Sequence, residues 1–178
     1  MNDILLKAAL AYRDICKHQY IFTLSNGECI HIIFKPQNFV HLAGLRKFSD
    51  VRVFDPMYTA TNIYRRILKH DISVADVQCS VHYDPDTRAR IENLCRLGEL
   101  LHTSQIVWNF DQRKAYIHSR IKSNVLFFKD DGFNFYLLLG AAQDGATYYP
   151  ETFFLRYDDA YIKGQTIVQI EKREQRTP

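Results

Sequence analysis

The sequence predicts an α+β fold in which an N-terminal helix, a β-hairpin and further helices precede a mainly antiparallel sheet. Apolar residues recur at helical spacing over residues 3–17, which indicates an amphipathic helix. Asn26-Gly27 separates two segments rich in β-branched and aromatic residues, a pattern typical of a hairpin. Short segments of β type follow residue 105, and turn residues separate them. Consecutive strands joined in this way favour antiparallel pairing.

The first half of the chain is expected to be helical around one hairpin, which should pair residues 20–24 with residues 29–34. Asn2 or Asp3 can cap the first helix. Four later segments are expected to be helices: residues 38–44, ended by Gly44; residues 59–69, with Thr61 near the cap; residues 73–78, capped by Ser73 and Asp76; and residues 84–102, opened by Asp84-Pro85.

The sequence pattern of the second half of the chain predicts strands. They are expected over residues 106–110, 115–118, 125–129, 133–139, 152–157 and 166–170. Residues 142–150 are expected to be a loop, and the charged tail 171–178 is expected to fray. No linker, repeat or low-complexity stretch divides the sequence, so residues 1–178 are expected to form one domain.

Composition favours a folded cytoplasmic protein. Hydrophobic residues make up 47% of the chain and charged residues 24%, which argues against disorder. No apolar run approaches the ~20 residues that span a bilayer, and the N-terminus lacks the features of a signal peptide, so no membrane contact is expected. The four cysteines form no C-x-x-C pair and are expected to be buried small hydrophobes. A net charge of +3 does not by itself indicate nucleic acid.

Familiar catalytic and cofactor motifs are missing from the sequence. No glycine-rich nucleotide-binding motif follows a predicted strand, and neither a zinc-protease motif nor a nucleophile elbow is present. The pairs Asp130-Asp131 and Asp158-Asp159 fall at predicted turns, where acids are common, and do not resemble a two-metal site. No metal, cofactor or serine nucleophile is therefore expected.

One segment combines a titratable side chain with two cations. His41 lies on a short turn after a predicted strand, and Arg46 and Lys47 follow Gly44 closely. A metal-independent ribonuclease needs a base for the 2′-hydroxyl, an acid for the leaving oxygen and cations for the charged phosphorane. Histidine titrates near neutrality and can take either proton role. Alternatively, His41 packs in the core, and Arg46 and Lys47 are merely solvated.

The pattern Phe39-x-His41-Leu-x-Gly44-Leu-x-Lys47 resembles the phage-associated nuclease-like domains of the barnase, EndoU, colicin and RelE group. A hairpin strand that ends at Phe34 precedes this pattern. The resemblance continues through four later segments: Tyr64-x-x-Ile67, the helix over residues 90–101, Ser119-x-Ile-Lys122 and Thr152-Phe-Phe154. It therefore covers most of the chain.

This resemblance implies helices that lead into a curved antiparallel sheet, with metal-independent RNA cleavage at one face of the sheet. Carried over by position, it implies three catalytic residues. They are His41, Lys47 and a late-strand hydroxyl, Thr152.

Further basic residues near a predicted strand end are candidates for substrate binding together with Arg46. His118, Arg120 and Lys122 would share one face of that stretch if it is extended, with Ser119 beside them. A solvated, charged strand edge is the alternative reading.

Three functional hypotheses remain open. The first is a ribonuclease that acts by general acid–base chemistry as a phage or mobile-element toxin or defence protein, with an antitoxin as a partner. The second is a non-catalytic module that binds RNA or a protein on the same fold, and the third is a degenerate, purely structural family member. The pairing of His41 with Lys47 favours the first hypothesis, and the lack of a clear second proton-transfer group favours the second. The sequence does not indicate the oligomeric state.

Overall fold

The computed structural model describes residues 3–55, 57–115, 123–130 and 134–177. By internal contacts the chain divides into two compact units. We call residues 1–17 and 35–97 the helical unit, and residues 18–34 and 98–178 the sheet unit. The expectation that the whole chain forms one domain stays a prediction. No helix among the described residues is long and apolar enough to cross a membrane.

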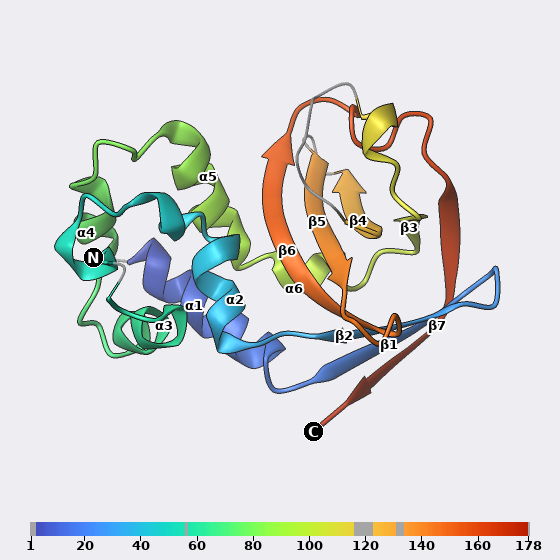
Figure 1. The fold of residues 1–178 in the computed structure, drawn as a ribbon, viewed down its shortest axis with the longest axis horizontal. Coiled ribbons are helices and arrows are strands. Elements are labelled where there is room, and N and C mark those ends of the chain that lie inside the picture. Colours follow the sequence, from blue (N-terminus) through green and yellow to red (C-terminus); the bar gives the residue numbers. More distant parts are fainter. Residues whose placement is uncertain (1–2, 56, 116–122, 131–133, 178) are drawn as a thin grey trace. The chain divides into compact units, whose positions relative to one another are not determined.

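The helical unit holds five helices and two short 3-10 turns (Figure 1). The helices are α1 (Ile4–Ile15), α2 (Pro36–Leu42), α3 (Ala60–Leu68), α4 (Val74–Gln78) and α5 (Pro85–Leu94), and the 3-10 turns are η1 (Leu45–Lys47) and η2 (Arg52–Phe54). Asp3 caps α1, as expected, by accepting hydrogen bonds from the Leu5 and Leu6 amides. The capping box of Ser73 and Asp76 at α4 is also confirmed.

Three aromatic rings join α1, α2 and α3 in the core of the helical unit. The Tyr12 and Phe39 ring centroids lie 5.5 Å apart, and those of Phe39 and Tyr64 lie 4.9 Å apart. Both phenols are hydrogen-bonded: the Tyr12 hydroxyl donates to the Lys35 carbonyl and the Tyr64 hydroxyl to the Ala9 carbonyl. Because these hydrogen bonds offset the desolvation of the two buried hydroxyls, the three rings can pack α2 against α1 and α3.

The described residues of the sheet unit form seven strands, the short helix α6 (Leu97–Leu100) and a 3-10 turn, η3 (Gln112–Lys114). Helix α6 begins one residue before this unit. The strands are β1 (Gln19–Leu24), β2 (Cys29–Ile33), β3 (Gln105–Trp108), β4 (Val125–Asp130), β5 (Asn134–Ala141), β6 (Thr147–Arg156) and β7 (Ile167–Arg176). They form one closed sheet in the order β1-β2-β6-β5-β4-β3-β7. All pairings are antiparallel except that of β2 with β6. The α+β class with a mainly antiparallel sheet is thus confirmed.

Strand β5 is covered on both faces, since every residue from Phe135 to Gly140 is buried. Side chains of one face, including Tyr136 and Leu138, pack with Leu126 of β4 and with Tyr161 from a later loop. On the other face, the Phe135 ring stacks against the ring of Phe153. A strand buried on both faces reads as a continuous apolar run, as this segment does.

Several predicted boundaries were wrong. The helix expected over residues 84–102 breaks after Leu94, where the Asn93 side chain donates to the Ala89 carbonyl and competes with the helical ladder. The helix expected over residues 59–69 is confirmed as α3, and its N-cap is Thr59, two residues before Thr61. Strand β6 begins at Thr147, inside the expected loop. Ala115 ends the 3-10 turn η3, and the rest of the strand expected over residues 115–118 lies outside the described residues.

The cysteines were also predicted wrongly. All four thiols are free; Cys29 and Cys79 are exposed, and Cys16 and Cys95 are partly exposed. Cys29 illustrates the reason, because it precedes the buried Ile30 in β2 and so points to the opposite face of the strand.

The charged tail does not fray but forms most of β7. Residues 170–176 pair with β1 along its length, from Leu24 to Gln19. Their charges pair with one another: Glu174 bonds both Lys172 and Arg176, and these cations lower the pKa of Glu174 to about 2. Charged side chains on the outer face of β7 do not prevent its backbone from pairing, because side chains and backbone hydrogen bonds point in different directions in a strand.

We therefore expect that deletion of residues 171–178 opens the sheet between β1 and β7. Each lost backbone hydrogen bond is worth about 1 kcal/mol, so the loss of several should lower the free energy of unfolding by about 3 kcal/mol. Urea denaturation measures the change. Deletion of residues 177–178 alone, which follow β7, is the control, and equal stability of the two truncated proteins would contradict this assignment.

Candidate active site

The segment around His41 is held by apolar residues that point inward. Phe39, Val40 and Leu42 of α2 are buried, whereas His41 lies on the exposed face of the same helix. The alternative in which His41 packs in the core therefore does not fit this structure. The helix ends at Gly44, whose φ of 73° is the left-handed conformation that glycine adopts without strain. The chain then turns into η1, which presents Arg46 and Lys47 outward.

Gly44 also leaves room for a cation from α5. A Cβ atom at Gly44 would lie 3.2 Å from Nη1 of Arg90 and 3.4 Å from its Cδ, so the Arg90 side chain lies directly over the glycine. Arg90 is half-buried, and this burial lowers the pKa of its guanidinium, while Asp84 and Asp86 act in the opposite direction. An arginine remains protonated at any physiological pH. A fixed positive charge thus lies at the C-terminal end of α2.

The surroundings of the His41 imidazole favour its neutral form. Partial burial lowers the pKa of His41 below its ordinary value of 6.5, and the charges of Arg46 and Arg90 lower it further. A neutral imidazole can accept a proton at neutral pH. The side chain therefore combines accessibility, the capacity to act as a base, and two neighbouring cations.

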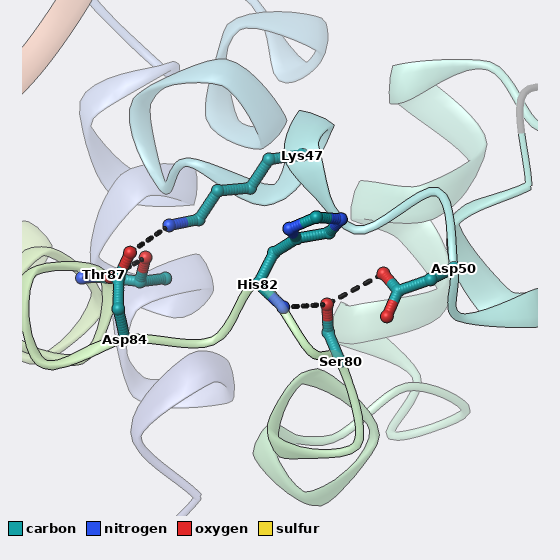
Figure 2. A network of polar contacts seen from close by, with 6 residues as sticks. All are labelled: Lys47, Asp50, Ser80, His82, Asp84 and Thr87. Carbon is teal, nitrogen blue, oxygen red and sulfur yellow. Dashed lines mark hydrogen bonds and ion pairs between the residues drawn. The ribbon is translucent and has the colours of Figure 1, made fainter.

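Lys47 is engaged with Asp84 at the start of α5 (Figure 2). Its Nζ lies 2.7 Å from Oδ2 of Asp84, while Oδ1 of Asp84 accepts hydrogen bonds from the amide and the hydroxyl of Thr87. Lys47 and Thr87 hold the pKa of Asp84 well below its usual range. The ion pair is partly exposed and ties η1 to α5, but it also balances the charge of Lys47.

A second imidazole, that of His82, lies in the loop before α5 and near Asp50 (Figure 2). Oγ of Ser80 donates to Oδ1 of Asp50 over 2.7 Å, and the His82 amide donates to Oγ of Ser80 over 3.1 Å. The Val81 amide donates to the other Asp50 oxygen. These bonds fix the loop before α5, and Figure 2 shows the His82 ring pointing toward the segment that carries Lys47 and Asp50.

The structure brings together only part of the predicted site. His41, Arg46 and Lys47 lie in the helical unit, whereas Thr152 lies in β6 of the sheet unit, opposite Leu138 of β5. A catalytic pairing of Thr152 with His41 stays a prediction. Four of the predicted substrate-binding residues lie outside the described residues: His118, Ser119, Arg120 and Lys122.

Beside Thr152, a shift in register accommodates a carboxylate. Pro150 and Thr152 pair with consecutive residues of β5, so Glu151 is the extra residue of a bulge. Oε2 of Glu151 accepts a hydrogen bond from the buried Ser123 hydroxyl. A Cβ atom at Gly140 would overlap the Glu151 carboxylate, so the Glu151 side chain would have to shift to accommodate it.

The structure adds several residues to the site that the sequence did not indicate. They are Arg90, Asp84 and Thr87, together with the loop residues Asp50, Ser80 and His82. Asp84 carried a usable signal, because its position before Pro85 marks an N-cap whose carboxylate can also bind a cation. Among the described residues, no three His, Cys, Asp or Glu side chains are grouped so that they could hold a metal ion.

Comparison with known proteins identifies one family. The family model described as phage-Barnase-EndoU-ColicinE5/D-RelE like nuclease4 matches residues 4–176. No curated protein and no solved structure matches the chain.

The cations beside His41 make its titration testable. We expect Arg46→Gln to raise the pKa of His41, because it removes a positive charge that disfavours protonation. The pKa can be followed by NMR through the imidazole proton signals. Arg65→Gln makes the same charge change on the exposed side of α3 and should leave the His41 pKa unchanged.

The lowered pKa of His41 also determines how the stability of the protein depends on pH. Because the pKa of folded His41 is lowered, its contribution to stability is present above the ordinary value of 6.5 and is lost as the pH falls through the folded pKa. An upward displacement of the His41 titration relative to 6.5 in the wild-type protein would contradict the described environment.

Asp84 should matter to the helical unit mainly as a cap. We expect Asp84→Ala to lower the free energy of unfolding by about 1–2 kcal/mol, since it removes the N-cap of α5 and one exposed ion pair. Asp84→Asn keeps a capping oxygen and should recover most of this loss. Chemical denaturation measures both variants. Asp86→Ala, in the first turn of α5, is the control; an equal effect of all three variants would refute the capping role.

Proposed function

Because the chain belongs to the phage-Barnase-EndoU-ColicinE5/D-RelE like nuclease family, we propose that it cleaves RNA without a metal ion by general acid–base chemistry. One observation carries this proposal for the helical unit. An accessible imidazole with a lowered pKa lies beside two guanidinium groups, those of Arg46 and Arg90. A base next to fixed cations is what the transfer of a proton near a phosphate requires.

In the proposed reaction, His41 takes the proton from the ribose 2′-hydroxyl. The 2′-oxygen attacks the adjacent phosphorus, and the bond to the 5′-oxygen breaks. The products are a 2′,3′-cyclic phosphate and a 5′-hydroxyl that has received a proton. Arg46 and Arg90 offset the negative charge that accumulates on the phosphorane oxygens. The Arg46 side chain is exposed and can change its conformation when substrate binds, whereas the Arg90 side chain is held over Gly44.

The proton for the leaving oxygen needs a second donor. We propose Lys47 or Thr152, the other catalytic residues that the family pattern implies, as this donor. His82 is a further candidate, because its ring faces the segment that carries Lys47 (Figure 2). The basic stretch His118–Lys122 is proposed to bind the RNA backbone, since phosphate contacts are made mainly by basic side chains.

A toxin or phage-defence role, with an antitoxin as a protein partner in the cytoplasm, accords with the phage association in the description of the family. A non-catalytic RNA- or protein-binding role is the second candidate. The ion pair of Lys47 with Asp84 favours it, because a balanced lysine contributes less to the stabilisation of a transition state than a free one.

His41→Ala should separate these roles. If His41 transfers a proton, its removal should lower the cleavage rate by about 10²–10⁴-fold. Because the side chain is exposed, the melting temperature should change little. RNA cleavage and thermal melting are to be measured on the same variant, with Lys47→Ala and Thr152→Ala alongside. Undiminished specific activity together with a large drop in melting temperature would remove His41 from the active site.

Chelation provides the second arm of this experiment. Since the cationic role is assigned to arginines, cleavage should survive EDTA. Loss of cleavage on chelation, restored by added magnesium, would overturn the proposed chemistry. His70→Ala, a similarly exposed histidine of the helical unit, is the matched control for His41→Ala.

A further inference from the structure

We propose that a pocket in the sheet unit binds one nucleotide, either free or within an RNA strand. The pocket has a volume of about 560 Å³ and lies where β3 begins and β4 ends. Its lining includes His102, Ser104, Gln105 and Phe128, together with the ion pair of Glu99 with Lys129. Small-molecule sites commonly have about 300–1,000 Å³, so the space suits a ligand of nucleotide size.

The backbone at the rim of the pocket is held by three hydrogen bonds to its carbonyl groups. The Arg173 guanidinium of β7 donates to the Thr103 carbonyl, and the Thr103 hydroxyl donates to the Gln105 carbonyl over 3.0 Å. The Ile170 amide donates to the Ser104 carbonyl over 2.8 Å. The backbone of the rim is therefore fixed to β7 before any ligand arrives.

Three polar side chains of the lining can hydrogen-bond to a ligand. Within the part of the chain that the structure describes, no hydrogen bond is made by the imidazole of His102, the hydroxyl of Ser104 or the amide of Gln105. Together they offer donors and acceptors of both kinds. Polar groups that converge on a cavity and have no partner are the usual means by which a site orients a ligand.

Phe128 supplies a flat apolar surface beside these groups. Ile106 pairs with Phe127, so the antiparallel register sets Phe128 opposite Gln105, with both side chains on the same face of the strands. Phe128 is half-buried, and its ring remains partly open to the pocket. A ring for stacking next to an amide for base edges is the combination that recognises unpaired bases.

The ion pair supplies the charge for a phosphate. Nζ of Lys129 lies 2.6 Å from Oε2 of Glu99, and both side chains are partly exposed. An ammonium has three donors, so a lysine that bonds one carboxylate can still donate to a phosphate oxygen. Glu99 orients Lys129 but repels a phosphate. The two residues should therefore affect nucleotide binding in opposite directions.

This opposition gives a test that a folding defect cannot imitate. We expect Lys129→Gln to weaken the binding of AMP about tenfold and Glu99→Gln to strengthen it severalfold, although both variants break the same ion pair. Binding is measured by isothermal titration calorimetry and by NMR shifts of the pocket amides. Effects of the same sign in both variants, or the absence of binding at millimolar AMP, would overturn the proposal.

Two further comparisons identify the ligand class. Ribose 5-phosphate should bind at least about tenfold more weakly than AMP, because it lacks the base that stacks on Phe128. Equal binding of the two would reduce the pocket to a phosphate site and refute the nucleotide assignment. Gln105→Ala should weaken AMP binding, whereas His31→Ala, which changes an exposed histidine in β2, should not.

A short single-stranded RNA distinguishes a strand site from a site for free nucleotides. If the RNA displaces AMP, as followed by the NMR shifts of the pocket amides, the pocket is a site for an RNA strand. If the RNA does not displace AMP, the pocket is a site for free nucleotides. The inference does not depend on cleavage at His41: a protein that binds AMP here but does not cut RNA would overturn only the proposed ribonuclease. A protein that cuts RNA through His41 but binds no AMP would overturn only this inference.

Discussion

The contact of Arg90 with Gly44 is the constraint on which the candidate active site depends. Gly44 must take a left-handed backbone conformation to end α2, and it must lack a Cβ atom so that the guanidinium can lie over it. The two requirements meet at one residue. Any side chain at this position would strain the turn and press on the Arg90 side chain, whose charge adds to burial and to Arg46 in lowering the pKa of His41.

The sequence predicted those elements well whose formation depends on interactions between neighbouring residues. The hairpin at Asn26-Gly27, the glycine end of α2 and the capping box at Ser73 depend on a few neighbouring residues, and they appear as expected. The C-terminal part of β7 was missed, because the charged residues 171–176 form a strand only through pairing with β1, which lies more than 140 residues earlier in the chain. No local signal in residues 171–176 carries that information.

The candidate active site was likewise predictable only where its residues are neighbours in the sequence. His41, Arg46 and Lys47 are neighbours in sequence, so their clustering could be recognised before the structure was known. Arg90 and Asp84 reach them from α5, and His82 from the loop before it, through tertiary packing that no spacing rule captures. The pocket near Phe128 likewise combines two separate segments. Its polar side chains lie in residues 102–105, and the register of β3 with β4 places Phe128 and Lys129 beside them.

The closed sheet has a consequence for synthesis of the protein on the ribosome. Its strands β1 and β2 emerge early, the helices α2 to α5 follow them, and β7 emerges last. The helices can pack as soon as α5 is complete, because α1 already precedes them. Strand β1, by contrast, keeps one edge unpaired until β7 arrives, and such an edge can pair with other chains. A nascent chain that stalls before residue 167 would therefore carry an aggregation hazard that the finished protein lacks.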